Sequence, residues 1–288
     1  MMDTVAGTRS ATERMARSED AARADPVIVF EHVQLAFDER VVLRDVNFTL
    51  RRGQTLVILG ASGSGKSTAL KIITGLLKPD GGVVYVNGQR VDHLSEQEMM
   101  PVRADLGMIF QEGALFDSLT VRENVGYKLY EETDMPLAEI DTRVTEVLGF
   151  IGLAEHLDKM PSALSGGQRR RVAIARALAF KPRILLYDEA TTGLDPITAI
   201  TVDDEVIKLR DIEGVSSIVV THQLRDAFYV ATHMAVRAAD GSVSIVDASP
   251  ETERLTTFIM LREGVIVFEG DAQALRGCTD PYIQTFLS

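Results

Sequence analysis

The stretch from Thr55 to Thr68 reads TLVILGASGSGKST and decides the fold of this chain. Its first five residues form a continuous apolar run, which is typical of a strand buried on both faces of a parallel sheet. The residues from Gly60 onward fit the phosphate-loop pattern G-x-x-x-x-G-K-S. We expect a helix to follow from about Ser67 to about Leu77. A merely flexible glycine loop is the alternative, which the strand before and the helix after disfavour.

The loop supplies a first set of candidate ligands for a bound phosphate chain. Its glycines let successive backbone N–H groups point at phosphate oxygens, and the helix N-terminus adds its dipole. The Lys66 ammonium is expected on the β- and γ-phosphates, and the Ser67 hydroxyl is expected to ligate Mg²⁺. The candidate residues are Gly60, Ala61, Ser62, Gly63, Ser64, Gly65, Lys66, Ser67 and Thr68.

A second apolar run, Ile184 to Tyr187, ends in the two acids Asp188 and Glu189. Asp188 lies at the predicted strand end, where it would bind Mg²⁺ directly or through water. Glu189 would lie beside the γ-phosphate and act as the general base for an attacking water. Strands often end in acidic turns, so this pattern becomes specific only together with the phosphate loop.

Composition excludes several classes of protein. The chain has 288 residues, 45% hydrophobic and 25% charged, which is ordinary globular usage. Its formal net charge of −12 disfavours nucleic acid as the main partner. The one cysteine, Cys278, excludes an intrachain disulfide and a cysteine zinc cluster, and it fits a reducing cytosol. No apolar stretch approaches the roughly 20 residues that cross a bilayer.

Strand and helix signals alternate along the chain and predict an α/β fold with a mainly parallel sheet. Residues 1–25 are polar, without apolar periodicity or a secretory h-region, so a disordered leader is favoured over an amphipathic helix. Strands are expected at Val27–Phe30, Val41–Leu50, Val83–Gly88 and Ser217–Val220. The segment from about residue 112 to 163 is mostly helical and is interpreted as an inserted subdomain.

The stretch Leu164-Ser-Gly-Gly-Gln168 comes shortly before the acidic strand. With it, the sequence resembles the ATP-binding cassette (ABC) family, for which this pentapeptide is the signature. A helix N-cap at Ser165 explains the same residues structurally, and both interpretations are compatible. The resemblance implies a phosphate-loop ATPase of the ABC fold over residues 26–288. That fold has a parallel core like that of RecA, an antiparallel β subdomain and the helical subdomain, and it uses ATP and Mg²⁺.

Further positions match the family one by one. Gln111 resembles the Q-loop glutamine that contacts Mg²⁺, and Asp195 in Gly193-Leu-Asp195 resembles the D-loop acid near the dimer seam. His222 resembles the switch histidine that holds the γ-phosphate, and it completes the catalytic set with Glu189 and Lys66. Phe37 is placed where the family stacks an aromatic ring on adenine, although Phe30 and Phe37 both also fit a core role.

The resemblance also implies partners. In this family each ATP lies between the loop of one cassette and the signature of another, so Ser165, Gly166, Gly167 and Gln168 would act on the nucleotide of a second copy. A separate integral-membrane permease is expected to dock near residues 111–121, on the cytoplasmic face of the plasma membrane. Leu115 or Phe116 could instead pack inside the helical subdomain.

The stretch from Phe110 to Val125, Gly113-Ala-Leu-Phe116 above all, looks like the cassettes of the Mla/Mce lipid-transport group, the MlaF or Mkl type. This resemblance implies phospholipid transport with a permease of the MlaE type, and an Mce-type lipid-binding subunit as a further partner. A cassette for another solute is the alternative within transport. A soluble ABC protein acting on nucleic acid or ribosomes is the alternative outside it.

Three departures from the family pattern stand out. Ala190 replaces the usual proline after Glu189, and Gln223 replaces the usual aspartate after His222. Residues 237–255 read as an insertion, for which we expect a β-hairpin turning at Asp240 and Gly241 and then a polar loop over residues 247–254. It would contact a regulator or be an inert surface loop, and the inert interpretation is favoured.

Overall fold

The computed structural model describes residues 25–111 and 113–288. The expected leader lies outside the described residues except for Asp25, and so does the first residue of the expected helical subdomain.

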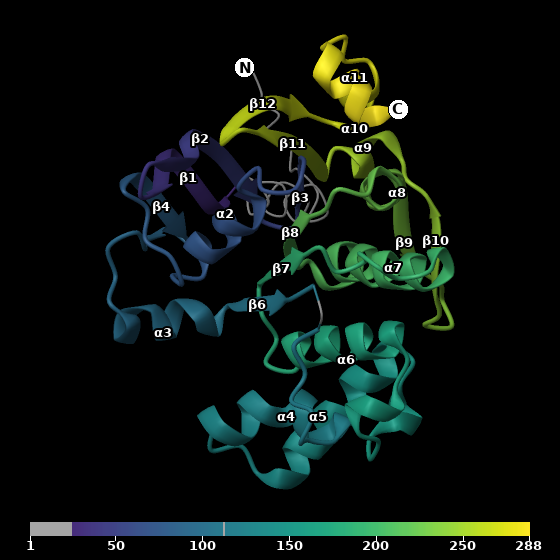
Figure 1. Cartoon of the computed structure of the whole chain (residues 1–288). Helices are drawn as coiled ribbons and strands as arrows, with labels where there is room; N and C mark the ends of the chain where they lie inside the picture. The colour runs from purple at the N-terminus through teal and green to yellow at the C-terminus, as the bar shows by residue number, and fades with distance from the viewer. Residues whose placement is uncertain (1–24, 112) are drawn as a thin grey trace, which may run out of the picture.

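A six-stranded sheet forms the centre of the molecule (Figure 1), in the order β12-β11-β3-β8-β7-β6. Five of these strands, β3, β6, β7, β8 and β11, are parallel to one another. The edge strand β12 pairs antiparallel with β11. The parallel core expected from the sequence is therefore confirmed. The bounds are β3 Thr55–Leu59, β6 Leu106–Ile109, β7 Ile184–Asp188, β8 Ser216–Val220, β11 Thr256–Arg262 and β12 Val265–Gly270.

Successive residues of the central strands face different cores, because side chains alternate across a sheet. On β7, Leu186 belongs to the core beneath the antiparallel sheet, whereas Leu185 and Tyr187 belong to the core shared with the helices α6 and α7. On β3, Ile58 and Leu59 divide in the same way between two cores. Burial on both faces explains why these strands are continuous apolar runs.

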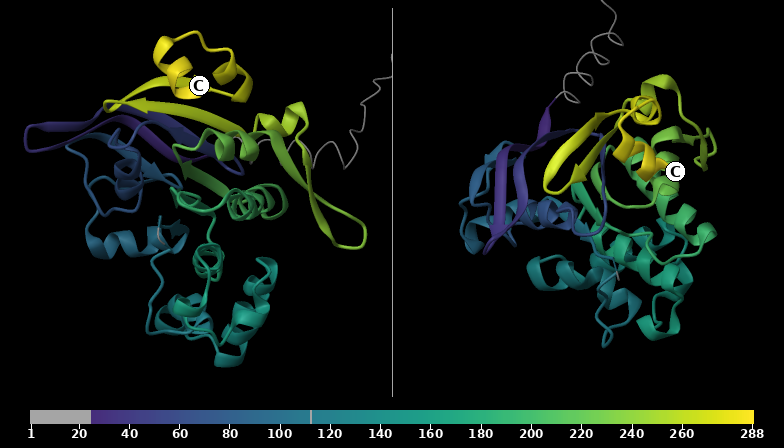
Figure 2. Two further views of the ribbon diagram at one scale, coloured as in Figure 1. Left: turned by 45° about the vertical axis from the view of Figure 1, so that its right-hand side comes forward. Right: turned by 45° about the horizontal axis from the view of Figure 1, so that its top comes forward.

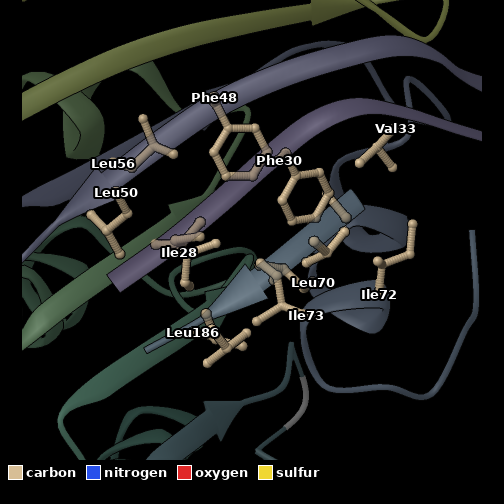
Figure 3. Close-up of a cluster of buried hydrophobic side chains, with 14 of the residues drawn as sticks. Ile28, Phe30, Val33, Phe48, Leu50, Leu56, Leu70, Ile72, Ile73 and Leu186 are labelled. Atoms are coloured by element: carbon tan, nitrogen blue, oxygen red, sulfur yellow. The ribbon is translucent and has the colours of Figure 1, made fainter. Parts of the chain in front are cut away.

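An antiparallel sheet in the order β2-β1-β4-β5 packs over β3 and helix α2. Its strands are β1 Pro26–Phe37, β2 Arg40–Arg51, β4 Gly81–Val86 and β5 Gln89–Arg90, and α2 is Lys66–Ile73. Figure 3 shows the rings of Phe30 and Phe48 stacked in this core, with centroids 4.3 Å apart, above Leu70 and Ile73 of α2. This layer holds the start of α2 against the central sheet.

The helical part extends away from the sheets, at the bottom of Figure 1. It contains α4 Val121–Glu132, α5 Leu137–Phe150, two short 3₁₀ turns at Ala154–His156 and Pro161–Ala163, and α6 Gly166–Leu178; α3 Glu96–Ala104 precedes it. Helix α4 begins with a capping box in which Thr120 and Glu123 satisfy each other's backbone N–H groups. That this part is a separate subdomain with bounds 112–163 stays a prediction.

The C-terminal third wraps the other side of the central sheet. It contains α7 Pro196–Glu213, α8 Leu224–Thr232, β9 His233–Arg237, β10 Val243–Asp247, α9 Pro250–Glu253, α10 Ala272–Arg276 and α11 Pro281–Leu287. Strands β9 and β10 pair as an antiparallel hairpin that projects from the body (Figure 2), with Asp240 and Gly241 in its turn. The expected hairpin is thus present, and its status as an insertion relative to the family stays a prediction.

Several boundary predictions were wrong, and strand β1, for example, continues to Phe37 past its expected end at Phe30. Helix α2 ends at Ile73 and not near Leu77, because Gly75 takes the left-handed backbone conformation (φ +70°) that stops a helix. The loop expected at 247–254 contains the short helix α9, which Ser249 caps by accepting from the N–H of Thr252. Among the residues that the structure describes, no helix combines the length and the apolar character needed to span a membrane.

The stacked Phe30 and Phe48 pair gives a stability prediction. Phe30→Ala should lower the free energy of unfolding by about 3–5 kcal/mol, because it opens a cavity in a core that leaves Phe30 only 2% exposed. Urea unfolding followed by circular dichroism measures the change. Phe37→Ala on the same strand is the control, since that ring is 48% exposed, and equal losses for both variants would contradict this account of the core.

Candidate functional site

The carboxyl ends of β3, β7 and β8 lie at one edge of the central sheet because the three strands are parallel neighbours. In the register, Ile58 pairs with Val220 and Asp188 also pairs with Val220. The phosphate loop follows β3, the acidic pair ends β7, and His222 follows β8. Three segments more than 30 residues apart along the chain are thereby brought to one place.

The loop after β3 depends on glycine at two crowded positions. Gly60 has φ +149°, and a Cβ there would lie 2.3 Å from the Leu261 carbonyl oxygen. Gly65 has φ +107°, and a Cβ there would lie 2.7 Å from Leu43 Cδ2. Strands β2 and β11 therefore press on the loop from two sides and fix its path.

Lys66 is buried to 4% exposure at the centre of this loop. Its ammonium donates hydrogen bonds to the carbonyl oxygens of Gly60 (2.8 Å) and Ala61 (3.1 Å) and lies 3.8 Å from Glu189 Oε1. Burial lowers the pKa of Lys66, while the neighbouring Glu189 and Asp188 carboxylates act in the opposite direction. An ammonium has three N–H donors, so one remains for a phosphate oxygen.

The donors expected for Mg²⁺ come together only in part. Ser67 Oγ donates a 2.7 Å hydrogen bond to Asp188 Oδ1, which joins the start of α2 to the end of β7. A hydroxyl and a carboxylate oxygen are the hard ligands that Mg²⁺ prefers, so this pair fits that ion. Gln111 lies exposed at the same sheet edge, two residues after β6, whose Ile109 pairs with Tyr187.

Glu189 and His222 face each other across the ends of β7 and β8. Their side chains lie 3.2 Å apart, from His222 Nδ1 to Glu189 Oε2. Glu189 adopts φ +51°, a left-handed conformation that costs a non-glycine residue of the order of 1 kcal/mol. The N–H of Glu189 donates to the Val220 carbonyl oxygen at 2.9 Å, so β8 holds the strained residue in place.

Arg170 was not among the residues predicted from sequence, yet it holds the loop after Glu189. From α6, its guanidinium donates hydrogen bonds to the carbonyl oxygens of Glu189, Ala190 and Thr192. Arginine suits this role because its planar fork of N–H donors reaches several acceptors at once. The sequence offers no signal for this contact, because the carbonyl oxygens that it joins carry no side-chain identity.

The structure separates the two candidate adenine-stacking rings. Phe30 is 2% exposed and belongs to the core, whereas Phe37 is 48% exposed at the tip of the β1–β2 hairpin. Phe37 pairs with Arg40, and the Arg40 guanidinium reaches to 3.7 Å from where a Cβ on Gly63 would lie. An exposed ring therefore lies on a hairpin that approaches the phosphate loop.

The signature residues form the N-terminus of α6. Ser165 caps the helix by accepting from the Gln168 N–H, and the Ser165 N–H donates to Gln168 Oε1 at 2.9 Å. Gln168 also lies 2.9 Å from the buried His156, to which the sequence assigned no role. Gly167 is required for packing, since a Cβ there would lie 1.9 Å from Thr198 Cγ2.

Asp195 caps α7 and lies next to this packing contact. Its carboxylate accepts from the backbone N–H groups of Ile197 and Thr198 and from the Thr198 hydroxyl. Hydrogen bonding by Thr198 lowers the pKa of Asp195. Within the described residues, no hydrogen bond or ion pair joins Asp195 or Ser165–Gln168 to the phosphate loop, whereas Lys66, Ser67, Asp188, Glu189 and His222 form one connected group.

Comparison with known proteins places these features in a family. A family model described as "ABC transporter" matches residues 43–192. The chain is 38% identical over 280 residues to the chloroplastic protein TRIGALACTOSYLDIACYLGLYCEROL 3 of Arabidopsis thaliana, covering 91% of this chain and 74% of that protein. It is 40% identical over 248 residues to the methionine import ATP-binding protein MetN of Bifidobacterium longum, covering 82% of this chain and 62% of that protein.

A MetN protein of Cutibacterium acnes is 42% identical over 241 residues, covering 81% of this chain and 66% of the relative. The chain thus spans less than two thirds of the length of these two MetN relatives. Among solved structures, the dimeric ATP-binding cassette MJ0796 bound to ADP and Pi is 31% identical, with a TM-score of 0.69 over 85% of this chain and 98% of that one. The cassette cbiO1 from Clostridium perfringens has a TM-score of 0.74 at 25% identity, over 91% of this chain and 95% of that one.

The contacts of Arg170 give a prediction for turnover. Arg170→Gln should reduce kcat for ATP hydrolysis by roughly tenfold or more and leave KM nearly unchanged, because a lost charge-assisted hydrogen bond costs about 1.5–3 kcal/mol and frees the strained Glu189 loop. Steady-state phosphate release measures both parameters. Arg183→Gln, which replaces an exposed arginine before β7, is the matched control. An unchanged kcat in the Arg170 variant would show that its hydrogen bonds to the loop after Glu189 do not support turnover.

Proposed function

Because the chain belongs to the ABC transporter family, we propose that it is the ATP-hydrolysing subunit of a transporter whose membrane path lies in a separate permease chain. Members of this family bind ATP with Mg²⁺ and hydrolyse it. The observation that carries the proposal is the convergence of Lys66, Asp188, Glu189 and His222 at one edge of the sheet. Such a constellation suits phosphoryl transfer to water.

We assign the binding roles from these contacts. The backbone of residues 60–65 and the remaining N–H of Lys66 would hold the β- and γ-phosphates, and the exposed ring of Phe37 would stack on adenine. Ser67 and Asp188 would hold Mg²⁺, with Gln111 approaching from the end of β6. When bound, the ion neutralises the charge of the phosphate oxygens.

The hydrolytic roles follow from the Glu189 and His222 pair. Glu189 would accept a proton from the water whose oxygen attacks the γ-phosphorus, while the bond from that phosphorus to the ADP oxygen breaks. His222, 3.2 Å from Glu189, would orient the carboxylate and contact the γ-phosphate. The buried ammonium of Lys66 stabilises the negative charge on the transferred group.

We further propose that two copies of the chain close on ATP. The signature residues Ser165–Gln168 hydrogen-bond within their own part of the chain, which is the arrangement expected if they serve the nucleotide of a second copy. The related cassette MJ0796 is dimeric in its structure with ADP and Pi. Asp195, which packs beside the signature through Thr198, would lie near the seam.

A permease would dock on the surface around residues 111–121. Leu115 is partly buried against the core of the helical part. Phe116 is 42% exposed, and its ring packs at a tilt of 41° against that of Tyr127, with centroids 4.6 Å apart. The buried Asn124 accepts from the Phe116 N–H and donates to three carbonyl oxygens, which gives this loop a fixed shape. An exposed aromatic pair, with Phe116 on this loop and Tyr127 on α4, suits a peripheral contact with a membrane protein at the cytoplasmic face.

The transported solute expected from the sequence needs revision. The MlaF or Mkl resemblance favoured phospholipid, but the MetN relatives from Bifidobacterium longum and Cutibacterium acnes are named for methionine import. The first candidate is therefore a small polar solute such as methionine. Lipid stays the second candidate, because a relative named for a galactolipid matches 91% of this chain. A permease of the MlaE type and an Mce-type subunit belong to that second candidate alone.

The assignment of the base is tested with Glu189→Gln. This variant should bind ATP, lose about 10²–10⁴-fold in kcat and accumulate as a closed dimer, because the amide keeps the shape of Glu189 but accepts no proton. Phosphate release and light scattering after gel filtration with ATP and Mg²⁺ measure these outcomes. Glu132→Gln, on the exposed end of α4, is the control. Normal turnover in the Glu189 variant would sink the assignment.

The two solute classes are separated by purifying the chain with its native permease in detergent. We expect methionine to stimulate the ATPase activity of the reconstituted complex and no lipid to copurify in defined amount. Mass spectrometry of the extracted complex tests the second candidate directly. One lipid class bound in fixed ratio, together with no effect of methionine, would reverse the order of the two candidates.

A further inference from the structure

A small buried hollow lies next to the segments that carry Glu189 and His222, where β7, β8, α7 and α8 meet. Its volume of about 10 Å³ is that of a single water site. Tyr187 and Thr221, which line it, immediately precede Asp188 and His222 in the chain. The cavity therefore adjoins the backbone that carries both sides of the catalytic centre.

Three polar atoms around this cavity have no hydrogen-bond partner: Tyr187 OH, Asp203 Oδ2 and Asp226 Oδ2. Their residues are 1%, 3% and 3% exposed. Buried polar atoms are almost always paired with protein or with an ordered water. Three orphan atoms that share one water-sized space match the two to four partners that a buried water takes.

The two carboxylates differ in their partners. Asp226 Oδ1 accepts hydrogen bonds from Arg225 Nε (2.8 Å) and Nη2 (2.6 Å), so Asp226 has a cationic partner. Asp203 has no cationic partner in an ion pair within the described residues. Burial, and next the charge of Asp226, raise the pKa of Asp203 to about 8. Asp203 is therefore mostly protonated at pH 7 and has a proton to donate.

We propose that the neutral Asp203 donates a hydrogen bond to one internal water, which links it to Asp226 and Tyr187, and that this link positions Glu189 and His222. Asp203 lies on α7, which begins beside Asp195, and Asp226 lies on α8, which begins just after His222. The link thus joins the two helices behind the catalytic edge. Asp203 and Asp226 are positioning residues, since neither touches the reacting atoms.

Thr221, which lines the cavity, also connects the start of α8 to the central sheet. Thr221 donates its N–H to the Ile58 carbonyl oxygen of β3 at 3.2 Å, and Thr221 Oγ1 accepts from the Gln223 N–H at 3.0 Å. Any movement of α8 away from α7 therefore shifts the segment that carries His222. The role of this segment in hydrolysis rests on the function proposed above.

Further ionisable groups lie near the two aspartates, and only Tyr187 among them lines the cavity. From α8 these are Arg225 and Tyr229, from α7 Asp204, Glu205 and Lys208, from β7 Tyr187, and from α6 Arg171. Lys208 pairs with Glu205 at 2.8 Å, and Tyr229 donates to Asp204 at 2.9 Å. Burial raises the pKa of Tyr187 above its ordinary value, so its hydroxyl stays a donor.

The link depends on pH in a defined direction. As pH rises through about 8, Asp203 loses its proton and two like charges face one cavity. The pKa of Asp203 is higher in the folded than in the unfolded chain, so Asp203 lowers the stability of the fold. This unfavourable contribution grows from about pH 4 to about pH 8 and stays constant at higher pH. Hydrolysis should therefore fall on the alkaline side as the link opens.

The test compares pH profiles of kcat for the full chain. Wild-type kcat should fall about tenfold between pH 7 and pH 9, since only about a tenth of Asp203 stays protonated one unit above its pKa. Asp203→Asn keeps a donor without a charge, so its kcat should change less than about twofold over this range. Asp204→Asn, which removes a charge from the same helix outside the cavity, is the matched control and should follow the wild type.

Two further measurements distinguish a positioning role of Asp203 from a folding defect and from a failure of the proposed function. Asp203→Leu removes the donor, and we expect lower kcat at every pH with KM for ATP nearly unchanged. Infrared difference spectra between pH 7 and pH 9 should show the carbonyl band of a protonated carboxylic acid in the wild type, absent in Asp203→Asn, whether or not the chain hydrolyses ATP. Parallel alkaline losses in the wild type and Asp203→Asn, or the lack of that band, would overturn the inference.

Discussion

The hydrogen bond from Ser67 to Asp188 joins the phosphate loop to the acidic strand, and the rest of the site depends on it. The two residues are 121 positions apart, and they meet because β8 pairs with both β3 and β7 in parallel register. Parallel strands put all their carboxyl ends at one edge. A slip of one residue would turn every side chain to the opposite face and separate the pair.

Around this bond the molecule concentrates charge and backbone strain in a small volume. Lys66 is buried between loop carbonyl oxygens and Glu189, and Glu189 itself sits at φ +51°. Neither feature is stable alone, so surrounding contacts hold each of them: Arg170 and Val220 fix the Glu189 loop, and β2 and β11 fix the glycines. The candidate site is thus held in shape by contacts from α6, β8, β2 and β11 around it.

Much of this could be predicted from sequence because its signals are local. The strand Thr55–Leu59 has the bounds that its apolar run indicates, and the acidic strand ends at Asp188 as expected. Prediction failed where spatial neighbours decide. The contact of Arg170, the partner of Gln168 in His156 and the buried pair of Asp203 and Asp226 each join segments apart in the chain. The end of α2 was missed for a different reason, because the local stop signal at Gly75 was not used.

The sequence by itself determined the fold class, the phosphate loop and the family. Binding a phosphate chain and Mg²⁺ requires glycines, a lysine and acids at set spacings, and few other residues can replace them. Only the tertiary structure decided which aromatic is core and which is free, since Phe30 and Phe37 share one strand and differ only in what covers them. Burial and charge pairing are properties of neighbours in space. For that reason the protonation of Asp203 and the strain at Glu189 became visible only in the folded chain.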